Sequence, residues 1–382
     1  MAQTAPKRRD EYREDVAGRA NVADTPELLT YYDDLERYEA GALWTVANKI
    51  EPWQPRSGSV PVLWRYADLR EPVMRSLDLV TAEKAGRRVI YLNNPGRRDV
   101  SAAVGWLYSG LQVMNPGEVA SSHAHSASAL RFIMEGEGAY TVVDGHKMTL
   151  GANDFVLTPN GTWHEHGVEA TGTACIWQDG LDIPLVNALE ANFYVVHPDL
   201  QQAVGHPVDD VRQAFGNPGL VPSTGTWSKP YSPLLKYEWA PTYEALNRYA
   251  KVTDGSPHDG VMMNYINPVS GGPVMQTIGA AMQMLRPGER TKAHRHTGSF
   301  IYQCCKGRGY SIIDGKRFDW QERDIFCVPS WMWHEHANLS DRDDACLFTF
   351  NDLPVMQALG LYREEAFGDN GGYQTPFHSP PA

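Results

Sequence analysis

The chain contains two copies of one long segment, and this internal duplication limits its fold more than any other feature. Residues 112–128, QVMNPGEVASSHAHSAS, align with residues 283–299, QMLRPGERTKAHRHTGS. Residues 144–166, DGHKMTLGANDFVLTPNGTWHEH, align with residues 314–336, DGKRFDWQERDIFCVPSWMWHEH, at almost the same offset. A repeat with only two copies and a long period indicates a duplicated domain and not a solenoid.

Each copy has the sequence pattern of an all-β domain. Short runs rich in β-branched and aromatic residues, such as LRFIMEG, AYTVV and DFVLTP, alternate with Gly, Pro and Asn/Asp turns. Many short strands at this spacing favour a barrel or a sandwich.

Helices are expected outside the two copies. DTPELLTYYDDLERYEAGALW has helix start signals at Asp24, Thr25 and Pro26. RYADLREPVMRSLDLV predicts a second amphipathic piece that is interrupted at Pro72, and TYEALNRYA predicts a helix between the copies. We therefore expect an N-terminal helical arm, a first β domain, a connector, a second β domain and a tail, at residues 1–85, 86–190, 191–260, 261–367 and 368–382.

Charge and composition exclude several classes of function. A formal net charge of −12 argues against a nucleic-acid partner, because phosphate binding needs a basic face. No apolar run approaches the roughly 20 residues of a membrane helix, and the charged start MAQTAPKRRDEYREDV lacks the apolar core of a secretory signal. The five cysteines are an odd number without CxxC spacing, so we expect a reduced cytoplasmic protein with buried cysteines.

Paired histidines are the strongest chemical signal in the sequence. Residues two apart on a strand point to the same face, so each pair presents two imidazoles together. A single pair is usually solvated, but two pairs in each copy indicate metal ligands. Imidazole suits iron, zinc, copper or nickel, and three such ligands leave an open position for a substrate. Most of the 13 histidines lie in four pairs: His123/His125, His164/His166, His294/His296 and His334/His336.

The motifs around these histidines resemble a known family. PGEVASSHAH followed by PNGTWH resembles the two cupin motifs, G(X)5HXH and PXGXXH, although Ser, Ala and Leu fill the stretch where cupins usually have a carboxylate ligand. Together with HSASALRFIMEGEGAYTVVDG, WQDGLDIP and FNDLPVMQALGLYREEA, residues 25–367 resemble gentisate 1,2-dioxygenases and their salicylate- and hydroxynaphthoate-cleaving relatives. The resemblance implies a mainly β bicupin, with two double-stranded β-helix (jelly-roll) barrels and with N-terminal and connecting helices.

The resemblance also implies an iron-dependent ring cleavage. Fe(II) would be held by His123, His125 and His164, and O2 would be inserted between the carboxylate- and hydroxyl-bearing carbons of gentisate to give maleylpyruvate. Arg131, on the strand after His125, would bind the substrate carboxylate. Family members are usually tetramers, so we expect a homo-oligomer.

Four further residues are expected near the substrate by the same resemblance. His166 would hydrogen-bond the substrate or the oxygens derived from O2, unless it only orients a ligand. Asp182 would lie near the substrate hydroxyls, with a turn-forming role as the alternative. Gln112 and Arg87 would complete the substrate shell, and the neighbouring Arg88 could serve in place of Arg87.

The second copy is expected to differ in chemistry. His294, His296 and His334 keep the ligand pattern, so a second metal is possible. However, Tyr302 stands where the first copy has its carboxylate anchor, and Trp331 adds bulk where the first copy has a glycine. We expect a structural or vestigial metal site there.

Other readings of the sequence remain open at this point. Salicylate or 1-hydroxy-2-naphthoate could replace gentisate, since one small group in a hydrophobic pocket is worth only about 1–3 kcal/mol of discrimination. Oxalate decarboxylases and quercetin-cleaving enzymes are also bicupins, but they normally keep the carboxylate ligand. A non-catalytic small-molecule-binding bicupin is the third class, although storage relatives tend to have lost their histidines.

Overall fold

The computed structural model describes residues 23–224 and 227–377 and divides the chain into two compact units, Met1–Arg56 and Ser57–Ala382. The first unit contains α1 (Pro26–Glu36) and α2 (Leu43–Ile50). α1 begins where the sequence predicts, because the Thr25 hydroxyl accepts a hydrogen bond from the Leu28 amide at 3.2 Å and Pro26 occupies the first turn.

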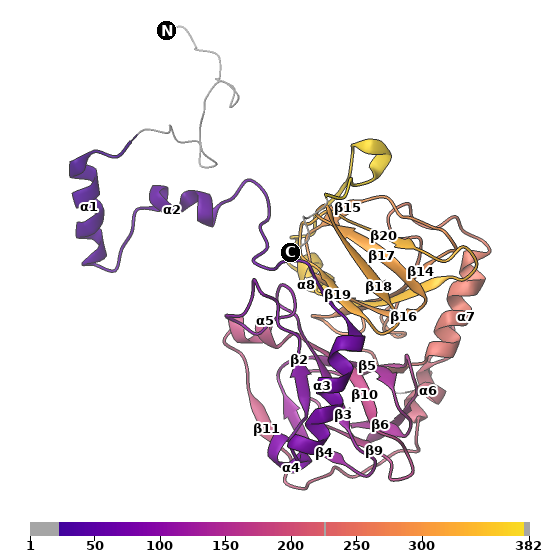
Figure 1. The fold of residues 1–382 in the computed structure, drawn as a ribbon. Helices are drawn as coiled ribbons and strands as arrows, with labels where there is room; N and C mark the ends of the chain where they lie inside the picture. The colour runs from indigo at the N-terminus through magenta and orange to yellow at the C-terminus, as the bar shows by residue number, and fades with distance from the viewer. Residues whose placement is uncertain (1–22, 225–226, 378–382) are drawn as a thin grey trace. The chain divides into compact units, whose positions relative to one another are not determined.

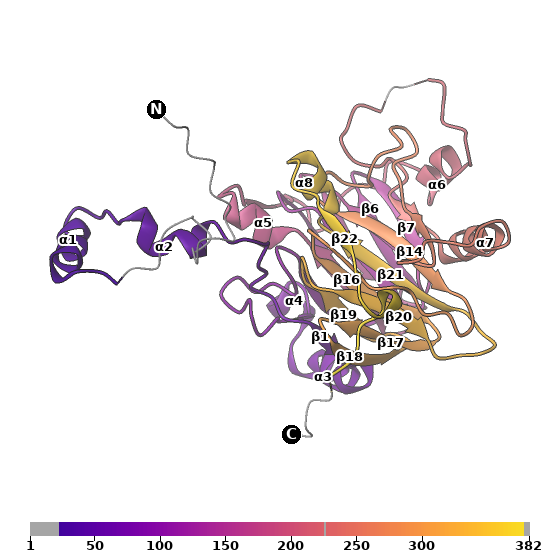
Figure 2. The ribbon, with the colours of Figure 1, turned by 90° about the horizontal axis from the view of Figure 1, so that it is seen from above.

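The second unit contains both β domains, each made of a six-stranded and a five-stranded sheet (Figures 1 and 2). In the first domain the six-stranded order is β12-β8-β5-β10-β3-β2 and the five-stranded order is β11-β4-β9-β6-β7. The strands are β2 (Val89–Tyr91), β3 (Tyr108–Met114), β4 (Val119–His125), β5 (Ala129–Glu135), β6 (Ala139–Val143), β7 (His146–Leu150), β8 (Phe155–Thr158), β9 (His164–Val168), β10 (Cys175–Leu181), β11 (Tyr194–Val196) and β12 (Lys236–Tyr237).

The second domain repeats this arrangement, with the orders β1-β19-β16-β21-β14-β13 and β18-β17-β20-β15-β22. The predicted duplication and the two-barrel fold class are therefore confirmed. The strands are β1 (Val62–Trp64), β13 (Val261–Asn264), β14 (Gly279–Leu285), β15 (His294–His296), β16 (Phe300–Lys306), β17 (Arg308–Ile313), β18 (Lys316–Gln321), β19 (Ile325–Val328), β20 (His334–Asn338), β21 (Ala345–Asn351) and β22 (Glu364–Ala366).

The helices of the second unit lie between the strands and after the last one. The connector helix α7 covers the predicted TYEALNRYA segment, so that prediction is confirmed. The helices are α3 (Tyr66–Leu79), α4 (Ala82–Ala85), α5 (Ile183–Ala188), α6 (Asp210–Phe215), α7 (Trp239–Ala250), α8 (Leu353–Ala358) and a 3-10 turn (Asn370–Gly372).

α3 differs from the sequence prediction because it continues through Pro72. A proline inside a helix removes one backbone hydrogen bond and crowds the preceding turn. The helix nevertheless buries Tyr66 and Val73, and Leu69 and Leu77 pack against the core. Tertiary packing therefore outweighs the local cost, as is usual for helices in proteins.

Two of the expected regions supply elements to the β domains. The first compact unit ends at Arg56, and within the second unit β1 pairs with β19 of the second domain and α3 lies against β3. The expected connector supplies β11 and β12 to the first domain. Of the expected tail, residues up to 377 are described, and Gln374 donates its backbone amide to Glu335 at 2.8 Å; residues 378–382 lie outside the described part.

Both β domains contribute to one hydrophobic core. The rings of Phe132 and Phe348 stack at 4.0 Å between centroids, and Phe155 lies 5.2 Å from Phe348. All three side chains are fully buried. The two barrels are therefore held together by the kind of packing found inside a single domain.

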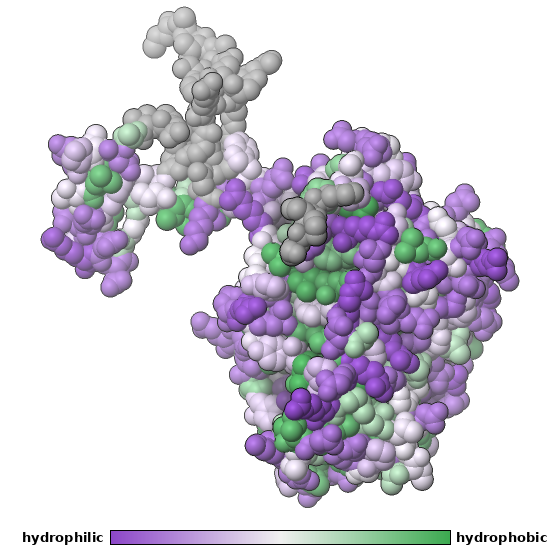
Figure 3. All heavy atoms as spheres, viewed as in Figure 1, coloured by the Kyte–Doolittle hydropathy of each residue, from purple (hydrophilic) through white to green (hydrophobic). Residues whose placement is uncertain are grey.

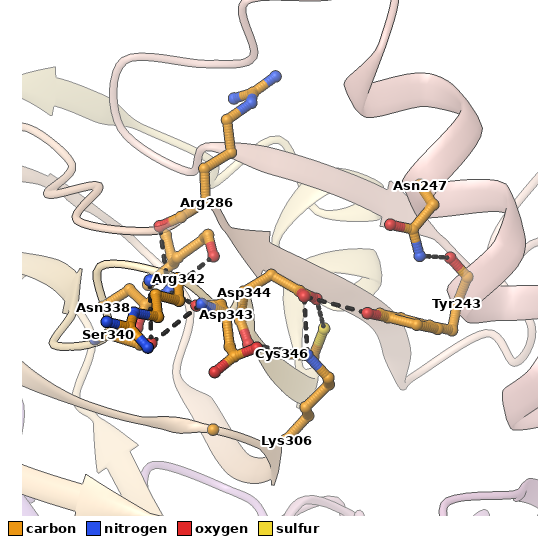
Figure 4. A network of polar contacts seen from close by, with 12 residues as sticks. Tyr243, Asn247, Arg286, Lys306, Asn338, Ser340, Arg342, Asp343, Asp344 and Cys346 are labelled. Atoms are coloured by element: carbon orange, nitrogen blue, oxygen red, sulfur yellow. Dashed lines mark hydrogen bonds and ion pairs between the residues drawn. The ribbon is translucent and has the colours of Figure 1, made fainter.

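Polar contacts attach the connector helix α7 to the second domain (Figure 4). The Tyr243 hydroxyl donates to the Asp344 carboxylate at 3.0 Å, and Lys306 reaches the same carboxylate at 2.7 Å. At the end of the helix, the Arg286 guanidinium donates to the Ala250 and Thr253 carbonyls at 3.2 and 2.6 Å. These contacts satisfy carbonyls that a helix end otherwise leaves unpaired.

The surface of the second unit is mixed. In the view of Figure 3, hydrophilic residues predominate and hydrophobic areas lie between them. No helix within residues 23–224 and 227–377 has both the length and the apolar character needed to cross a membrane.

Truncating the ring stack between the barrels should destabilise the protein. We expect Phe348→Ala to lower the free energy of unfolding by about 3–5 kcal/mol, the usual range for a buried aromatic residue. Chemical denaturation measures this loss, and Phe193→Ala, at a side chain that is 52% exposed, serves as the control with a change within about 0.5 kcal/mol. Equal denaturation midpoints for both variants would contradict a core shared by the two barrels.

Candidate metal centre

The neighbouring strands β4 and β9 bring three histidines together in the first barrel. His123 lies directly opposite His164, and His125 is on the same face of β4 two residues later. The ring centroid of His164 is 4.3 Å from that of His123 and 4.7 Å from that of His125. All three side chains are buried, and one donor nitrogen from each lies within 4.8 Å of the other two.

Hydrogen bonds fix which nitrogen of each ring faces the centre. A carbonyl oxygen can only accept, so a ring nitrogen beside it carries the proton and the other nitrogen keeps its lone pair. The Nε2 atoms of His125 and His164 are buried and have no hydrogen-bond partner among the residues that the structure describes. The Nδ1 donors and their acceptors are His123 to Ser121 O at 2.7 Å, His125 to Ala127 O at 2.7 Å and His164 to Thr162 O at 3.0 Å.

Burial keeps these imidazoles neutral. Desolvation lowers the pKa of His123 to about 3 and that of His125 to about 4, and it lowers the pKa of His164 well below its usual value. Neutral imidazoles with free Nε2 lone pairs are the form that binds a transition metal. The donor set therefore fits a divalent metal ion bound by three histidines.

A cavity of about 300 Å³ adjoins the histidines. His125 contributes to its wall, which links the cavity to the triad. The wall combines two arginines and a carboxylate with apolar side chains, so it suits a small anionic ligand with an apolar body. The lining residues are Ala85, Arg87, Val89, Tyr108, His125, Arg131, Asp179, Leu181 and Ile183.

Arg131 lies in this wall as the sequence analysis expected. Its Nη1 donates to the Thr158 hydroxyl at 3.0 Å, and its Nε lies 3.3 Å from Asp179 Oδ1. Burial lowers the pKa of Arg131 to about 10, against the opposing effect of Asp179, so the guanidinium stays charged at neutral pH. The cation and Asp179 are both almost completely buried.

Arg87, and not Arg88, reaches the cavity. Nη1 of Arg87 donates to Nε2 of His123 at 3.2 Å, the lone pair through which this histidine would bind a metal. Arg88 points elsewhere, since it pairs with Glu118 and donates to the Val113 carbonyl at 3.2 Å. The choice between the two arginines that the sequence left open is therefore resolved by their contacts.

His166 and Gln112 are buried polar side chains close to the triad. The His166 ring lies 5.5 Å from that of His164, and its Nδ1 is 3.1 Å from the Thr141 hydroxyl. Within residues 23–224 and 227–377, its Nε2 has no hydrogen-bond partner, and neither do the two polar atoms of the Gln112 amide. Gln112 lies two positions from Gly110 and four from Tyr108 on β3, so it shares the strand face of a cavity-lining residue.

Asp182, which the sequence places either near the substrate hydroxyls or in a turn, is not among the residues that line this cavity. Its carboxylate accepts a hydrogen bond from the Ser128 amide at 2.7 Å and another from the Thr277 hydroxyl. In the second domain Asp352 accepts from the Ser299 amide at 2.7 Å in the same way. Both copies repeat this contact, which is the arrangement expected for the turn-forming alternative.

Asp179 and Tyr108 are the cavity residues that sequence reasoning missed. Asp179 lies directly opposite Arg131 in the β5–β10 register. A charged residue in the middle of the buried strand CIWQDGL was a usable signal, because an unpaired carboxylate is rarely buried. Tyr108 gave no such signal, since a tyrosine is common on any strand.

The second domain repeats the triad in different surroundings. His294, His296 and His334 are buried, with donor nitrogens within 4.8 Å of one another. Nδ1 of His294 lies 3.2 Å from Glu364 Oε1, whereas the equivalent His123 donates to a backbone carbonyl. The second set therefore has a carboxylate as the hydrogen-bond partner of one ligand.

Aromatic residues surround this second triad. The Tyr302 ring lies 4.9 Å from that of His336 and stacks on Phe326 at 5.0 Å. Trp331 keeps the left-handed backbone of its counterpart Gly161, with φ of 64° against 72°. The Arg295 guanidinium lies over the Trp331 ring at 4.6 Å, so the indole packs beside this arginine.

Comparison with known proteins agrees with this architecture. The cupin domain family matches residues 110–184 and 281–350. Gentisate 1,2 dioxygenase 1 of Aquipseudomonas alcaligenes is 37% identical over 90% of this chain and 97% of its own length. The 5-aminosalicylate 1,2-dioxygenase of a Comamonas species is 37% identical over 91% and 92%.

A solved structure shows the same fold over nearly the whole chain. Salicylate 1,2-dioxygenase of Pseudoaminobacter salicylatoxidans, determined as adducts with gentisate, superposes with a TM-score of 0.85 at 30% identity. The match covers 94% of this chain and 99% of that one.

The chain has two cupin barrels and, in the first, a buried three-histidine cluster beside an arginine-lined cavity. Its relatives identify it as a ring-cleaving oxidoreductase of the bicupin class. Within that class, the chain belongs to the gentisate 1,2-dioxygenase family, whose members also include salicylate-type dioxygenases. The resemblance stated from the sequence is thereby confirmed.

The role of Asp182 can be tested by two substitutions. Burial raises its pKa to about 6, so the folded state binds a proton more tightly than the unfolded chain does, and this contribution to stability falls as pH rises from about 4 to 6. Asp182→Asn, which is neutral and can still accept from Ser128, should keep both turnover and melting temperature. Asp182→Ala should cost about 1–3 kcal/mol of stability.

Enzymatic turnover and thermal melting of both variants provide the measurement. A loss of turnover in Asp182→Asn at an unchanged melting temperature would show that the carboxylate acts in the reaction instead.

Proposed function

We propose that the chain is an Fe(II)-dependent gentisate 1,2-dioxygenase, with iron held by His123, His125 and His164. The observation that carries this proposal is one cavity in which a neutral histidine triad adjoins two arginines. Three neutral ligands leave the dipositive charge of the metal uncompensated, so an anionic substrate is favoured there. A ring with a carboxylate and an ortho-hydroxyl supplies that charge.

Bound Fe(II) would supply the centre at which electron density passes from the aromatic ring to O2. Both oxygen atoms enter the product, and the bond between the carboxylate- and hydroxyl-bearing carbons breaks. For gentisate the product would be maleylpyruvate. The side chains of this protein would bind and orient the substrate.

Arg131 would bind the substrate carboxylate. Charge-assisted hydrogen bonds from a buried guanidinium are strong, and Thr158 and Asp179 hold this one in place. Arg87 lies at the same cavity. Once its guanidinium leaves His123, it can pair with the substrate carboxylate or with a hydroxyl oxygen of the substrate. The two cations would orient the anionic substrate, and the apolar side chains of the wall would limit the access of water.

The second hydroxyl of gentisate has partners in the same wall. Asp179 can accept a hydrogen bond from a substrate hydroxyl, and burial raises the pKa of its carboxyl group. Burial also raises the pKa of the Tyr108 phenol, so this group stays protonated and can donate. His166 and Gln112 offer further unpaired polar atoms near the triad. These groups favour gentisate over salicylate, which lacks the second hydroxyl.

Salicylate and 1-hydroxy-2-naphthoate remain the alternative substrates. Val89, Leu181 and Ile183 give the cavity an apolar side that would accept an unsubstituted or fused ring. A non-catalytic binding role is the less favoured alternative, since it would not need the complete triad.

We also propose a cytoplasmic homo-oligomer, a tetramer. All five cysteines are free and buried, as suits a reducing compartment. In the first unit Leu43, Trp44, Ile50 and Trp53 are each 44–61% exposed, and apolar side chains gathered in this way are usually covered by a partner surface. Further copies of this chain are the proposed partners.

Oxygen consumption tests the proposed reaction directly. Purified protein loaded anaerobically with Fe(II) should consume one O2 per gentisate, faster than with salicylate or 1-hydroxy-2-naphthoate. Chelation of the metal should abolish uptake, and His164→Ala should bind no iron in the first domain. A faster rate on another 2-hydroxyaryl acid would change the substrate, and no uptake with any of them at full iron loading would contradict the reaction.

Replacing the carboxylate anchor should weaken substrate binding. A hydrogen bond to a charged group is worth about 1.5–3 kcal/mol, so Arg131→Met should lower kcat/KM for gentisate by about 10–150-fold, mainly through KM. Arg248→Met, at an exposed ion pair with Glu244, is the matched control and should leave both constants unchanged. Equal kcat/KM in the two variants, with equal melting temperatures, would remove Arg131 from the substrate site.

A further inference from the structure

A third group of side chains that could hold a metal ion lies outside the two histidine triads. His146 is the first residue of β7, Asp210 is the first residue of α6, and His206 belongs to the connector segment before that helix. The two imidazole rings stack at 3.8 Å between centroids with an interplanar angle of 11°. One donor atom from each of the three residues lies within 4.8 Å of the others.

The distances around Asp210 match those of a tetrahedral metal site. Its Oδ2 lies 3.0 Å from Nδ1 of His146 and 3.6 Å from Nδ1 of His206. Bonds of 2.0–2.2 Å at a tetrahedral angle place neighbouring ligand atoms about 3.3 Å apart. The lone pairs of two parallel imidazoles do not meet at one point, so the exposed His206 ring must turn out of its stack on His146 for an ion to bind.

Backbone contacts hold the ligand-bearing segments in place on both sides. The Gly205 amide donates to the Gly145 carbonyl at 3.1 Å, and the Asp209 amide donates to the Lys147 carbonyl at 2.9 Å. The Thr149 hydroxyl donates to the Asp209 carboxylate at 2.7 Å. The connector is thus fixed against β7 immediately beside each ligand, which lowers the ordering cost of binding.

Exposure and charge also suit an ion from solution. The side chains of His146, His206 and Asp210 are 22%, 47% and 24% exposed, so water and a metal can reach them. The nearby Lys147 is paired with Glu169 at 2.7 Å and does not compete for Asp210. Two histidines, one carboxylate and an open position form a ligand set that Zn(II) accepts.

We propose that His146, His206 and Asp210 form a Zn(II) site that clips the connector to the first barrel. The same connector supplies β11, in which Tyr194 pairs with His125 and Val196 pairs with His123. Zinc at this clip therefore stabilises the segment that lies along the strand of the first histidine triad. The site is separate from the proposed iron centre and does not depend on the proposed reaction.

Zinc binding to the full chain, measured by competition with a chromophoric chelator, tests this site. His206→Ala removes one ligand at a largely exposed position, and circular dichroism verifies that the variant folds. His197→Ala removes another connector histidine, one that packs on Trp163 at 4.8 Å, and serves as the matched control. Zinc held by the two buried triads is common to all three proteins and cancels in the comparison.

Wild type and His197→Ala should each bind one more zinc ion than His206→Ala. Zinc should also slow proteolytic cleavage of the connector in these two proteins and not in His206→Ala. A zinc-edge anomalous signal among the three side chains would locate the ion. Identical stoichiometry and affinity in wild type and His206→Ala would overturn the proposal and leave only a hydrogen bond between His146 and Asp210.

Discussion

The antiparallel pairing of β4 with β9 is the constraint on which the chemistry of this protein depends. It places His123 opposite His164, and a register irregularity between Ala120 and His123 sets that alignment. A slip of one residue would turn each of these side chains to the other face of the sheet. β11 from the connector pairs with the outer edge of β4, so this strand is held from both sides.

Duplication gave both barrels the same arrangement of three histidines. The residues around the two triads have since diverged, so the two sites differ in chemistry. In the first barrel a buried cation and a buried carboxylate face each other between β5 and β10. In the second barrel Tyr302 and Thr349 occupy the corresponding paired positions. The buried cation of the first barrel can bind an anion. The tyrosine at the same position in the second barrel packs against Phe326 instead. The difference between the two sites therefore lies beside the histidines and not in them.

Much of the fold and of the metal site could be predicted from the sequence, because both depend on local patterns. Histidine spacing on strands and the two repeated blocks need no knowledge of tertiary neighbours. The residues that line the cavity were harder to predict from the sequence. Asp179 is recognised only when its partner across the sheet is known. The sequence left two roles open for Asp182, because a family resemblance names a residue type without its contacts. The continuation of α3 through Pro72 likewise depends on its packing against core residues that are distant in the sequence.

The pairing of β1 with β19 has a consequence for how the chain is made. Val62 pairs with Cys327, and the Tyr66 amide donates to Asp324 at 2.8 Å. At synthesis rates of about 5–20 residues per second, the N-terminal strand waits on the order of tens of seconds for its partner to leave the ribosome. The edge strand must remain unpaired for that time, so the second barrel is completed only after translation of nearly the whole chain. Neither half of the duplicated protein can therefore be separated from the other by a simple cut between the barrels.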